Sequence, residues 1–326
     1  MYKGIYIYMK KRTKIIISTV LVFIVLAVAG IFLGALYLYN FALNPKNMKD
    51  VFTKDSTAVS RSETSGKAKE NPDWLKENST EEYMNSNDGL KLHAYQVQQK
   101  KKSDLYAVIV HGYKGNGLKM SSYAKRFYDM GFNLVVPDLR AHGKSEGNYI
   151  GMGWHDRLDV LKWTNSIIEK NENAKVVLFG VSMGAATVMM ASGEKMPQQV
   201  KAIIEDCGYT SVEAEFKKEL KTAFNLPSFP LLNAASLITD IKAGYNFKEA
   251  SAINQVKKLK KPALFIHGDK DTFVPFSMLD EVYNAASCEK EKLVVKGAGH
   301  AKSSSVDPDL YWGTIKNFLN KHVTNN

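Results

Sequence analysis

The longest apolar stretch lies near the beginning of the chain, at residues 15–39. It carries no charge, and only Ser18 and Thr19 interrupt it as clearly polar side chains. At about 1.5 Å per residue, a helix of this length crosses the roughly 30 Å hydrocarbon core of a bilayer with some tilt. A helix in the core of a soluble domain would carry a polar stripe, which is missing here. We therefore predict a basic n-region at residues 1–14, a transmembrane anchor at residues 15–39 and a polar tether at residues 40–70.

The sequence within and beside the apolar stretch predicts whether it is cleaved and how it is oriented in the membrane. Residues 27–29 read Ala-Val-Ala, as at a signal-peptide cleavage site, but the apolar run continues for ten residues beyond, which favours an uncleaved anchor. We expect Tyr37, Tyr39 and Phe41 to form an aromatic belt at the far interface. Five Lys/Arg lie before the run and three in the first fifteen residues after it. This bias predicts a cytoplasmic N-terminus and an extracytoplasmic domain, whether the chain starts at Met1 or at Met9.

Residues 71–326 alternate between short apolar runs and stretches with helical periodicity. The runs predict strands, the first of them an edge strand, at Leu90–Val97, Leu105–Val110, Asn133–Val136, Lys175–Phe179, Val200–Ile204, Ala263–Ile266 and Lys292–Val295. Helices are predicted at Ser121–Met130, Trp154–Glu169, Met183–Lys195, Pro275–Ala286 and Pro308–Lys321. Apolar strands that alternate with helices indicate an α/β domain, with a mostly parallel central sheet covered by helices on both faces.

One segment interrupts this alternation, between the strands that end near Asp206 and begin near Ala263. It holds a helix-like stretch at residues 212–223, a breaker run with two prolines at residues 226–230, and a second helical stretch at about residues 231–241. A structureless loop of more than fifty residues is rare in a compact domain. We therefore predict a helical cap insertion at about residues 211–250, over the carboxyl edge of the sheet.

The net charge of +11 does not lie on the predicted domain. Residues 1–69 hold eleven Lys/Arg against three Asp/Glu, and the rest of the chain holds 33 against 30. This excess favours an anionic membrane surface and argues against a nucleic-acid partner. The two cysteines, Cys207 and Cys288, are interpreted as unpaired buried thiols, and no metal-ligand spacing is present. Nothing in the pattern indicates an oligomeric state.

A candidate nucleophile lies between an apolar strand and a helix of small residues, where residues 180–184 read Gly-Val-Ser-Met-Gly. In this context the motif forms a sharp turn that exposes the hydroxyl of Ser182 near a helix N-terminus. A serine hydroxyl needs a base, and the base needs an orienting carboxylate. His300 follows a predicted strand and is the candidate base. Asp269 and Asp271 both follow the strand before it, so position alone leaves the acid open between them.

Several motifs together resemble the α/β-hydrolase superfamily over residues 85–320. They are His111-Gly112-Tyr113, Asp138-x-Arg140-x-His142-Gly143-x-Ser145, Gly180-x-Ser182-x-Gly184, His267-Gly-x-x-Asp271-x-x-Val274-Pro275 and Gly299-His300. Within the superfamily the chain is similar to bacterial esterase-like hydrolases with an N-terminal membrane segment, of the Bem46-like and serine-aminopeptidase-like kind. The resemblance implies the α/β-hydrolase fold and a triad of Ser182, His300 and Asp271. It also implies an oxyanion hole made of the backbone N–H groups of Tyr113 and Met183.

Two other motifs do not indicate nucleotide binding. Residues 143–145 read Gly-Lys-Ser but lack the upstream glycine of a phosphate-binding loop, and residues 112–117 have the wrong glycine spacing for a dinucleotide fingerprint. We therefore expect no cofactor and no metal.

The expected reaction is hydrolysis of a small-molecule or lipid-like carboxylic ester through an acyl-serine intermediate. Amide or peptide hydrolysis is the alternative, with Glu213, Glu215 and Glu219 as candidates for the substrate's amino terminus, although helical carboxylates are more often solvated. A third hypothesis is a tethered binding module without turnover. Apolar cap residues either line an acyl pocket or seat the cap on the sheet; they are Phe216, Phe224, Leu226, Phe229, Leu231 and Leu232.

Overall fold

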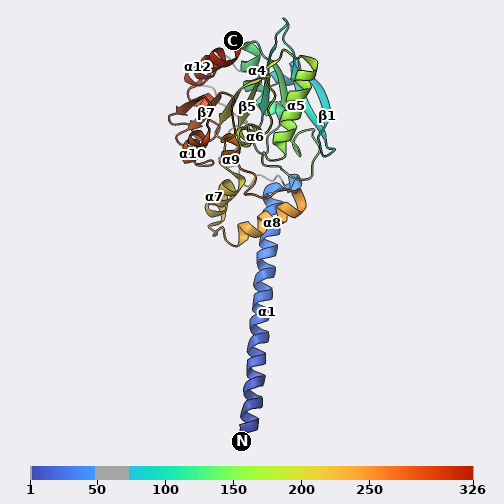
Figure 1. Ribbon diagram of the computed structural model, residues 1–326, viewed down its shortest axis with the longest axis vertical. Coiled ribbons are helices and arrows are strands. Elements are labelled where there is room, and N and C mark those ends of the chain that lie inside the picture. The colour runs from blue at the N-terminus through green and yellow to red at the C-terminus, as the bar shows by residue number, and fades with distance from the viewer. Residues whose placement is uncertain (1, 48–72, 326) are drawn as a thin grey trace.

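A computed structural model describes residues 2–47 and 73–325. At its centre lies an eight-stranded sheet with the order β1-β2-β4-β3-β5-β6-β7-β8 (Figure 1). The strands are β1 (Thr80–Asn85), β2 (Lys91–Val97), β3 (Leu105–Val110), β4 (Asn133–Pro137), β5 (Lys175–Val181), β6 (Val200–Asp206), β7 (Ala263–Gly268) and β8 (Lys290–Val295). The six strands from β3 to β8 pair in parallel, whereas β1 and β2 pair antiparallel with their neighbours. The predicted mostly parallel sheet is confirmed.

Alternate residues of the central strands pack against helices on opposite faces, because successive side chains of a strand point to opposite sides. Val108 and Leu178 belong to one buried cluster, and Ile109 and Phe179 to the other. The first face is covered by α5 (Asp156–Lys170), α6 (Met183–Ala191), α9 (Ala252–Val256) and α10 (Ser277–Ala285). The second is covered by α3 (Trp74–Asn78), η3 (Gly117–Met120), α4 (Ser121–Asp129), α11 (Ser303–Val306), α12 (Pro308–Leu319) and the π-helical turn η4 (Asn320–Thr324).

The first predicted strand is not at the edge of the sheet. It forms β2, and β1 pairs with its outer side. The edge strand β1 reads Thr-Glu-Glu-Tyr-Met-Asn and is largely exposed. Its polar sequence lacks the alternation by which a half-buried strand is detected, so sequence analysis missed it.

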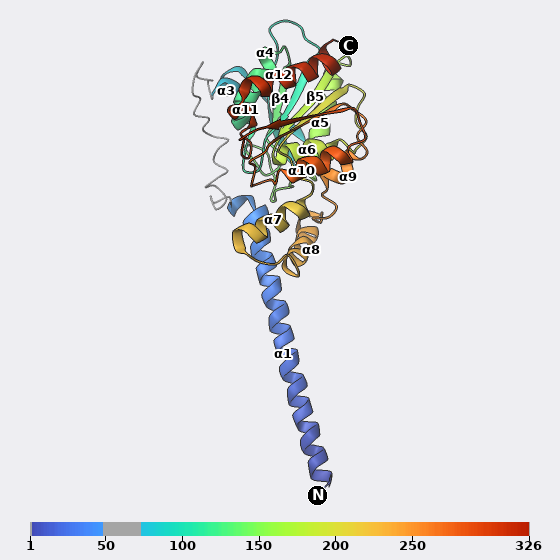
Figure 2. The same ribbon diagram turned by 90° about the vertical axis from the view of Figure 1, so that its left-hand side faces the viewer.

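The segment between β6 and β7 forms two helices, α7 (Val212–Phe224) and α8 (Leu231–Ala243), before α9. The side chain of Ser211 caps the start of α7, and α7 ends at Asn225, which is left-handed with a φ of 52°. Gly244 ends α8 in the same conformation. Helices α7 and α8 lie between the sheet and the protruding part of the N-terminal helix (Figures 1 and 2). We call these two helices and the loop between them the cap.

The N-terminal helix α1 (Tyr2–Leu43) is longer than the predicted anchor and is followed by a short 3-10 turn, η1 (Pro45–Asn47). Its stretch Thr13–Leu43 contains an 18-residue window with a mean hydropathy of 3.0 and is long and apolar enough to cross a membrane. The end of the helix nevertheless packs against α8, with Ala35, Tyr39 and Leu43 buried on one face at four-residue intervals.

Two predictions about this end of the helix are therefore wrong. Tyr39 is only 7% exposed and packs against protein instead of joining an aromatic belt, while Tyr37 remains exposed. Residues 40–43 belong to α1 and residues 45–47 form η1, so they do not belong to a tether, and residues 48–70 lie outside the described part of the chain. Hydropathy missed the docking because an apolar face suits lipid and protein equally well.

Candidate active site

Ser182 lies on the sharp turn between β5 and α6, with φ of 58° and ψ of −119°. A serine is held in this region only by strong constraints from its surroundings. A Cβ atom on Gly180 would lie 2.2 Å from the carbonyl oxygen of Gly184, and one on Gly184 would lie 2.1 Å from that of Val110. Only glycine fits at these two positions. The motif thereby holds the Ser182 hydroxyl above the carboxyl end of β5.

The structure brings Ser182, His300 and Asp271 together in hydrogen-bonding order. His300 lies in the loop after β8, and Asp271 in the loop after β7. The distance from His300 Nε2 to Ser182 Oγ is 2.8 Å, and that from His300 Nδ1 to Asp271 Oδ2 is also 2.8 Å. A proton on Nδ1 that is donated to the carboxylate leaves Nε2 free to accept from the serine hydroxyl. We call these three side chains the relay.

The two candidate acids have different partners. Asp269 Oδ1 accepts from the backbone N–H of Gly297 at 2.7 Å and so fastens the loop that carries the histidine. Asp271 is buried, which alone would raise its pKa, but hydrogen bonds from His267 and His300 outweigh burial and lower the pKa to about 2. Asp271 is therefore a carboxylate at neutral pH. Position alone could not distinguish the two residues, whereas the structure places Asp271 on the imidazole.

The predicted oxyanion donors belong to segments that border Ser182. Met183 is the first residue of α6, where a backbone N–H has no acceptor within the helix. Tyr113 follows Gly112, where a Cβ atom would lie 3.3 Å from Ser182 Cβ and 3.7 Å from its Oγ. Both segments lie beside the hydroxyl at which a tetrahedral intermediate would form.

Buried polar side chains hold the Gly112 loop in place. Burial lowers the pKa of His111 to about 3, so the ring is neutral at physiological pH. Its Nε2 accepts from the N–H of Leu139 at 3.0 Å, and its Nδ1 donates to the carbonyl of Gly112 at 2.8 Å. Asp138 accepts from the N–H of Gly117 at 2.7 Å. The motif that begins at Asp138 therefore supports the loop beside the nucleophile.

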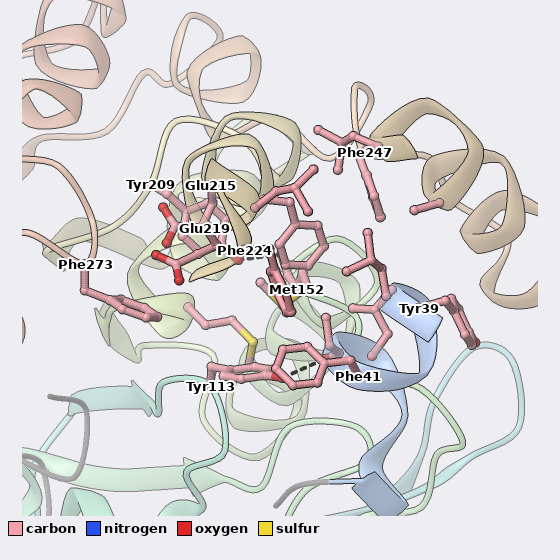
Figure 3. A pocket seen from close by; sticks show the side chains of 18 of the residues that line it. Tyr39, Phe41, Tyr113, Met152, Tyr209, Glu215, Glu219, Phe224, Phe247 and Phe273 are labelled. Carbon is pink, nitrogen blue, oxygen red and sulfur yellow. Dashed lines mark hydrogen bonds between the residues drawn. The ribbon is translucent and has the colours of Figure 1, made fainter. Parts of the chain in front are cut away.

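An apolar pocket opens beside the relay, with Ser182 and Met183 in its wall (Figure 3). It contains about 800 Å³ of space between atoms, its open mouth included. Cap residues and one residue beyond the cap line it: Phe216, Leu220, Phe224, Leu232, Ala235 and Phe247. The end of α1 supplies a further wall, made of Leu38, Tyr39, Phe41, Ala42 and Leu43. Sequence analysis missed this contribution of α1.

The predicted apolar cap residues divide among three places. Phe216, Phe224 and Leu232 line the pocket, as one of the two interpretations required. Leu226 and Phe229 are instead exposed, with Phe229 at 75% of its full accessibility. Leu231 packs against α1, since a Cβ atom on Gly34 would lie 3.0 Å from it.

Two acidic residues of α7 lie in the pocket wall, and the expectation that they are solvated is wrong for one of them. Glu215 is 3% exposed, and neither of its carboxylate oxygens has a hydrogen-bond partner among the described residues. Burial raises the pKa of Glu215 well above its usual range and so favours the neutral acid. Glu219 forms an ion pair with Lys218. Helical spacing was the available signal, because residues 215 and 219 share a face with the apolar positions 212, 216 and 220.

One group of potential metal ligands occurs in the described part of the chain. Donor atoms of Cys207, Asp271 and His300 lie within 4.8 Å of one another. Asp271 and His300 are hydrogen-bonded within the relay, and burial raises the pKa of the Cys207 thiol, so it is a poor ligand. We assign no metal to this group. Cys207 is a buried free thiol as expected, whereas Cys288 is partly exposed.

Comparison with known proteins finds similarity to a peptidase family and to a lipase. The family model described as serine aminopeptidase, S33, matches residues 101–229. YqkD, an uncharacterized protein of Bacillus subtilis (strain 168), is 29% identical over 213 residues, which are 65% of this chain and 70% of the relative. A thermostable monoacylglycerol lipase of Bacillus sp. (strain H-257) is 21% identical over 250 residues, 66% of this chain and 90% of the lipase.

Among solved structures, an esterase of Pyrococcus furiosus is similar with a TM-score of 0.63 and 22% identity, covering 80% of this chain and 97% of the esterase. An acylaminoacyl peptidase of Pyrococcus horikoshii is similar with a TM-score of 0.57 and 18% identity, covering 74% of this chain and 41% of the peptidase. At these identities the likeness shows the fold, and it includes both esterases and peptidases.

Proposed function

We propose that the chain is a serine hydrolase of the α/β-hydrolase superfamily that cleaves carboxylic esters through an acyl-serine intermediate. The observation that carries the proposal is the hydrogen-bonded relay of Ser182, His300 and Asp271 beside an apolar pocket. This relay is the arrangement that activates a serine hydroxyl.

In the proposed reaction, Ser182 Oγ attacks the acyl carbonyl while His300 Nε2 takes its proton. The carboxylate of Asp271 stabilises the imidazolium and holds the ring in place. The N–H groups of Tyr113 and Met183 stabilise the oxyanion, to which one such donor contributes about 3–4 kcal/mol in enzymes of this kind. His300 then gives the proton to the leaving alcohol. In the second half of the reaction, water attacks the acyl carbonyl while His300 Nε2 takes its proton. His300 then returns the proton to Ser182 Oγ, which releases the acid and frees Ser182.

The pocket favours an ester with an apolar acyl chain. Aromatic and aliphatic side chains make up most of its lining, and its acidic groups carry little net charge. Burial raises the pKa of Glu215 and so favours its neutral form, and the charge of Glu219 is balanced by Lys218. Such a pocket stabilises hydrocarbon better than it stabilises an ion.

A second candidate function is hydrolysis of an amide bond next to a free amino group. It is favoured by one observation, the two unsatisfied carboxylate oxygens of Glu215 in the pocket wall. An ammonium group bound there would ionise Glu215 and pair with it. Glu215→Gln would then abolish cleavage of an aminoacyl p-nitroanilide but leave cleavage of a p-nitrophenyl ester within about threefold.

A fluorophosphonate probe tests the proposed chemistry on the full chain in membranes. Wild-type protein should react, and mass spectrometry of its peptides should locate the adduct on Ser182. A panel of p-nitrophenyl esters and p-nitroanilides then separates ester from amide cleavage. A chain that folds but takes up no probe would be a binding module, and the proposal would be abandoned.

We further propose that α1 anchors the enzyme as one membrane span with the catalytic domain outside the cytoplasm. The charge bias across the apolar stretch supports this orientation. Protease added to intact protoplasts should digest the catalytic domain. Digestion that requires lysis would place the domain in the cytoplasm.

A further inference from the structure

The apolar helix α1 is longer than a membrane requires. The stretch Thr13–Leu43 has 31 residues, about 46 Å at 1.5 Å per residue, whereas the hydrocarbon core is about 30 Å thick. About twenty residues from Thr13, ending near Leu33, suffice to cross it. Large apolar residues in this part are at least half exposed, except Ile31, which is half-buried, and full burial against protein begins at Ala35. The bilayer surface therefore falls at the level of Gly34.

The cap lies at this same level. Gly34 touches the side chain of Leu231, the first residue of α8. Phe229, two residues earlier in the loop between α7 and α8, is 75% exposed. In both ribbon views the cap is the part of the domain nearest to the protruding half of α1 (Figures 1 and 2). With α1 as the proposed membrane span, this arrangement would bring the cap to the membrane surface.

The outer side of α8 carries two large exposed apolar side chains beside the polar residues Asn233 and Asp240. Leu237 and Ile241, one turn apart, are 60% and 76% exposed, while Leu232 and Ile238 are buried on the inner side. Lys242 is next to Ile241, and its Nζ lies 5.6 Å from the centre of the Tyr39 ring, about five residues along α1 from the bilayer surface. Apolar side chains with a lysine just above them match the boundary between acyl chains and headgroups.

The end of α1 also connects this surface to the active site. The carbonyl of Ala42 accepts from the hydroxyl of Tyr113 at 2.6 Å, and the carbonyl of Leu43 accepts from the N–H of Ile150 at 2.8 Å. Phe41 packs edge-on against Phe224 with ring centres 5.6 Å apart. The helix proposed as the membrane span therefore also forms a wall of the pocket and holds the loop beside Ser182.

From these contacts we infer that the outer face of the cap, formed by Phe229, Leu237 and Ile241, lies in the bilayer surface, and that the pocket takes the acyl chain of a lipid ester directly from the bilayer. The inference rests on the proposed ester hydrolysis and names its substrate class. An acyl chain that moves from the bilayer into the pocket stays in apolar surroundings, so its transfer avoids the cost of exposing hydrocarbon to water.

The first test uses the full chain in vesicles of phosphatidylcholine and phosphatidylglycerol. The two substrates are a long-chain monoacylglycerol in the bilayer and water-soluble p-nitrophenyl butyrate. Ile241→Glu should lower hydrolysis of the bilayer ester about tenfold or more, because a charge replaces a side chain buried in the interface. The same variant should leave p-nitrophenyl butyrate hydrolysis within twofold, which also shows that it folds.

Leu310→Glu is the matched control, since Leu310 is 44% exposed on α12, at the opposite end of the domain from the cap. It should change neither rate. Equal loss with both substrates in Ile241→Glu, or equal loss in both variants with the bilayer ester, overturns the inference. The inference also fails if the wild type cleaves p-nitrophenyl butyrate but not the bilayer ester.

A second measurement does not depend on activity. Tryptophan fluorescence of Phe229→Trp, after subtraction of the wild-type signal, should be quenched by vesicles that contain brominated phosphatidylcholine. Leu310→Trp should not be quenched. If the wild type cleaves neither ester, the proposed function fails, and this quenching still decides whether the cap touches the bilayer. Equal quenching at the two positions shows that it does not.

Discussion

The relay and the pocket meet at Ser182, but they are built in different ways. The relay comes from three loops at the carboxyl ends of β5, β7 and β8, and hydrogen bonds of 2.8 Å hold it together. The pocket comes from α1 and the cap, which are separated by more than 150 residues of sequence, and apolar contacts hold it together. Changes in the relay should therefore lower the rate with every substrate. Changes in the pocket should alter which substrate is preferred.

The largest effect is expected at the nucleophile. Ser182→Ala should lower kcat for every p-nitrophenyl ester by about 10⁴–10⁶-fold, because the members of a triad act as one unit. The circular dichroism spectrum and the melting temperature should stay close to those of the wild type. Wild-type turnover in this variant would exclude Ser182 as the nucleophile.

The two acids offer a sharper comparison within the relay. Asp271→Asn should lower kcat about 10³–10⁴-fold, because an amide neither stabilises an imidazolium nor fixes the same tautomer. Asp269→Asn is the matched control and should lower kcat less than tenfold, since Asp269 only accepts from the N–H of Gly297. A larger loss in Asp269→Asn would reverse the assignment.

The effect of a substitution in the pocket should depend on the length of the ester's acyl chain. Phe224→Ala removes apolar surface from the pocket wall and should lower kcat/KM about tenfold for a dodecanoate ester. The butyrate ester, which fills less of the pocket, should change by less than threefold. Phe216→Ala should act in the same direction, while Tyr83→Ala, on the exposed edge strand, should affect neither ester. A uniform loss over the chain-length series would show that Phe224 acts on the relay instead.

The smallest effect concerns the pH dependence of stability. Burial raises the pKa of Glu205 to about 8, although its Oε2 accepts from the N–H of Gly208. Folding therefore binds a proton between the unfolded pKa near 4.5 and about 8. The free energy of unfolding should fall as pH rises through this window, by up to about 1.4 kcal/mol per pH unit.

Urea unfolding at pH 5.5 and 7.5 measures this slope, and Glu205→Gln should reduce it. The neighbouring Asp206, whose pKa burial raises to about 6, contributes in the same direction over the lower part of the window and remains in the variant. Equal slopes in the wild type and in Glu205→Gln would show that Glu205 is ionised in the folded protein.

Short-range patterns explain why the relay could be predicted and the pocket only in part. The turn at Ser182 needs glycines at fixed spacing, and His300 and the two candidate acids follow apolar strands whose order along the chain brings them to one edge. The choice of Asp271 over Asp269 came from the family resemblance. No local pattern reveals that Tyr39 and Phe41 face protein, because lipid and protein both accept apolar side chains. Whether Glu215 is buried or solvated depends on how α7 packs over the sheet, which a sequence pattern does not specify.

The wall that α1 contributes has a practical consequence for preparing the protein. Removal of residues 1–43 would ease purification, but it would also remove Phe41 and the partner of the Tyr113 hydroxyl. Inhibitors selected against such a shortened protein would be fitted to an altered pocket. Cleavage after Ala29 would be different, since residues 30–43 would stay with the domain. A form released from the membrane by this cleavage would keep its pocket wall, so it would be the suitable form for inhibitor screening.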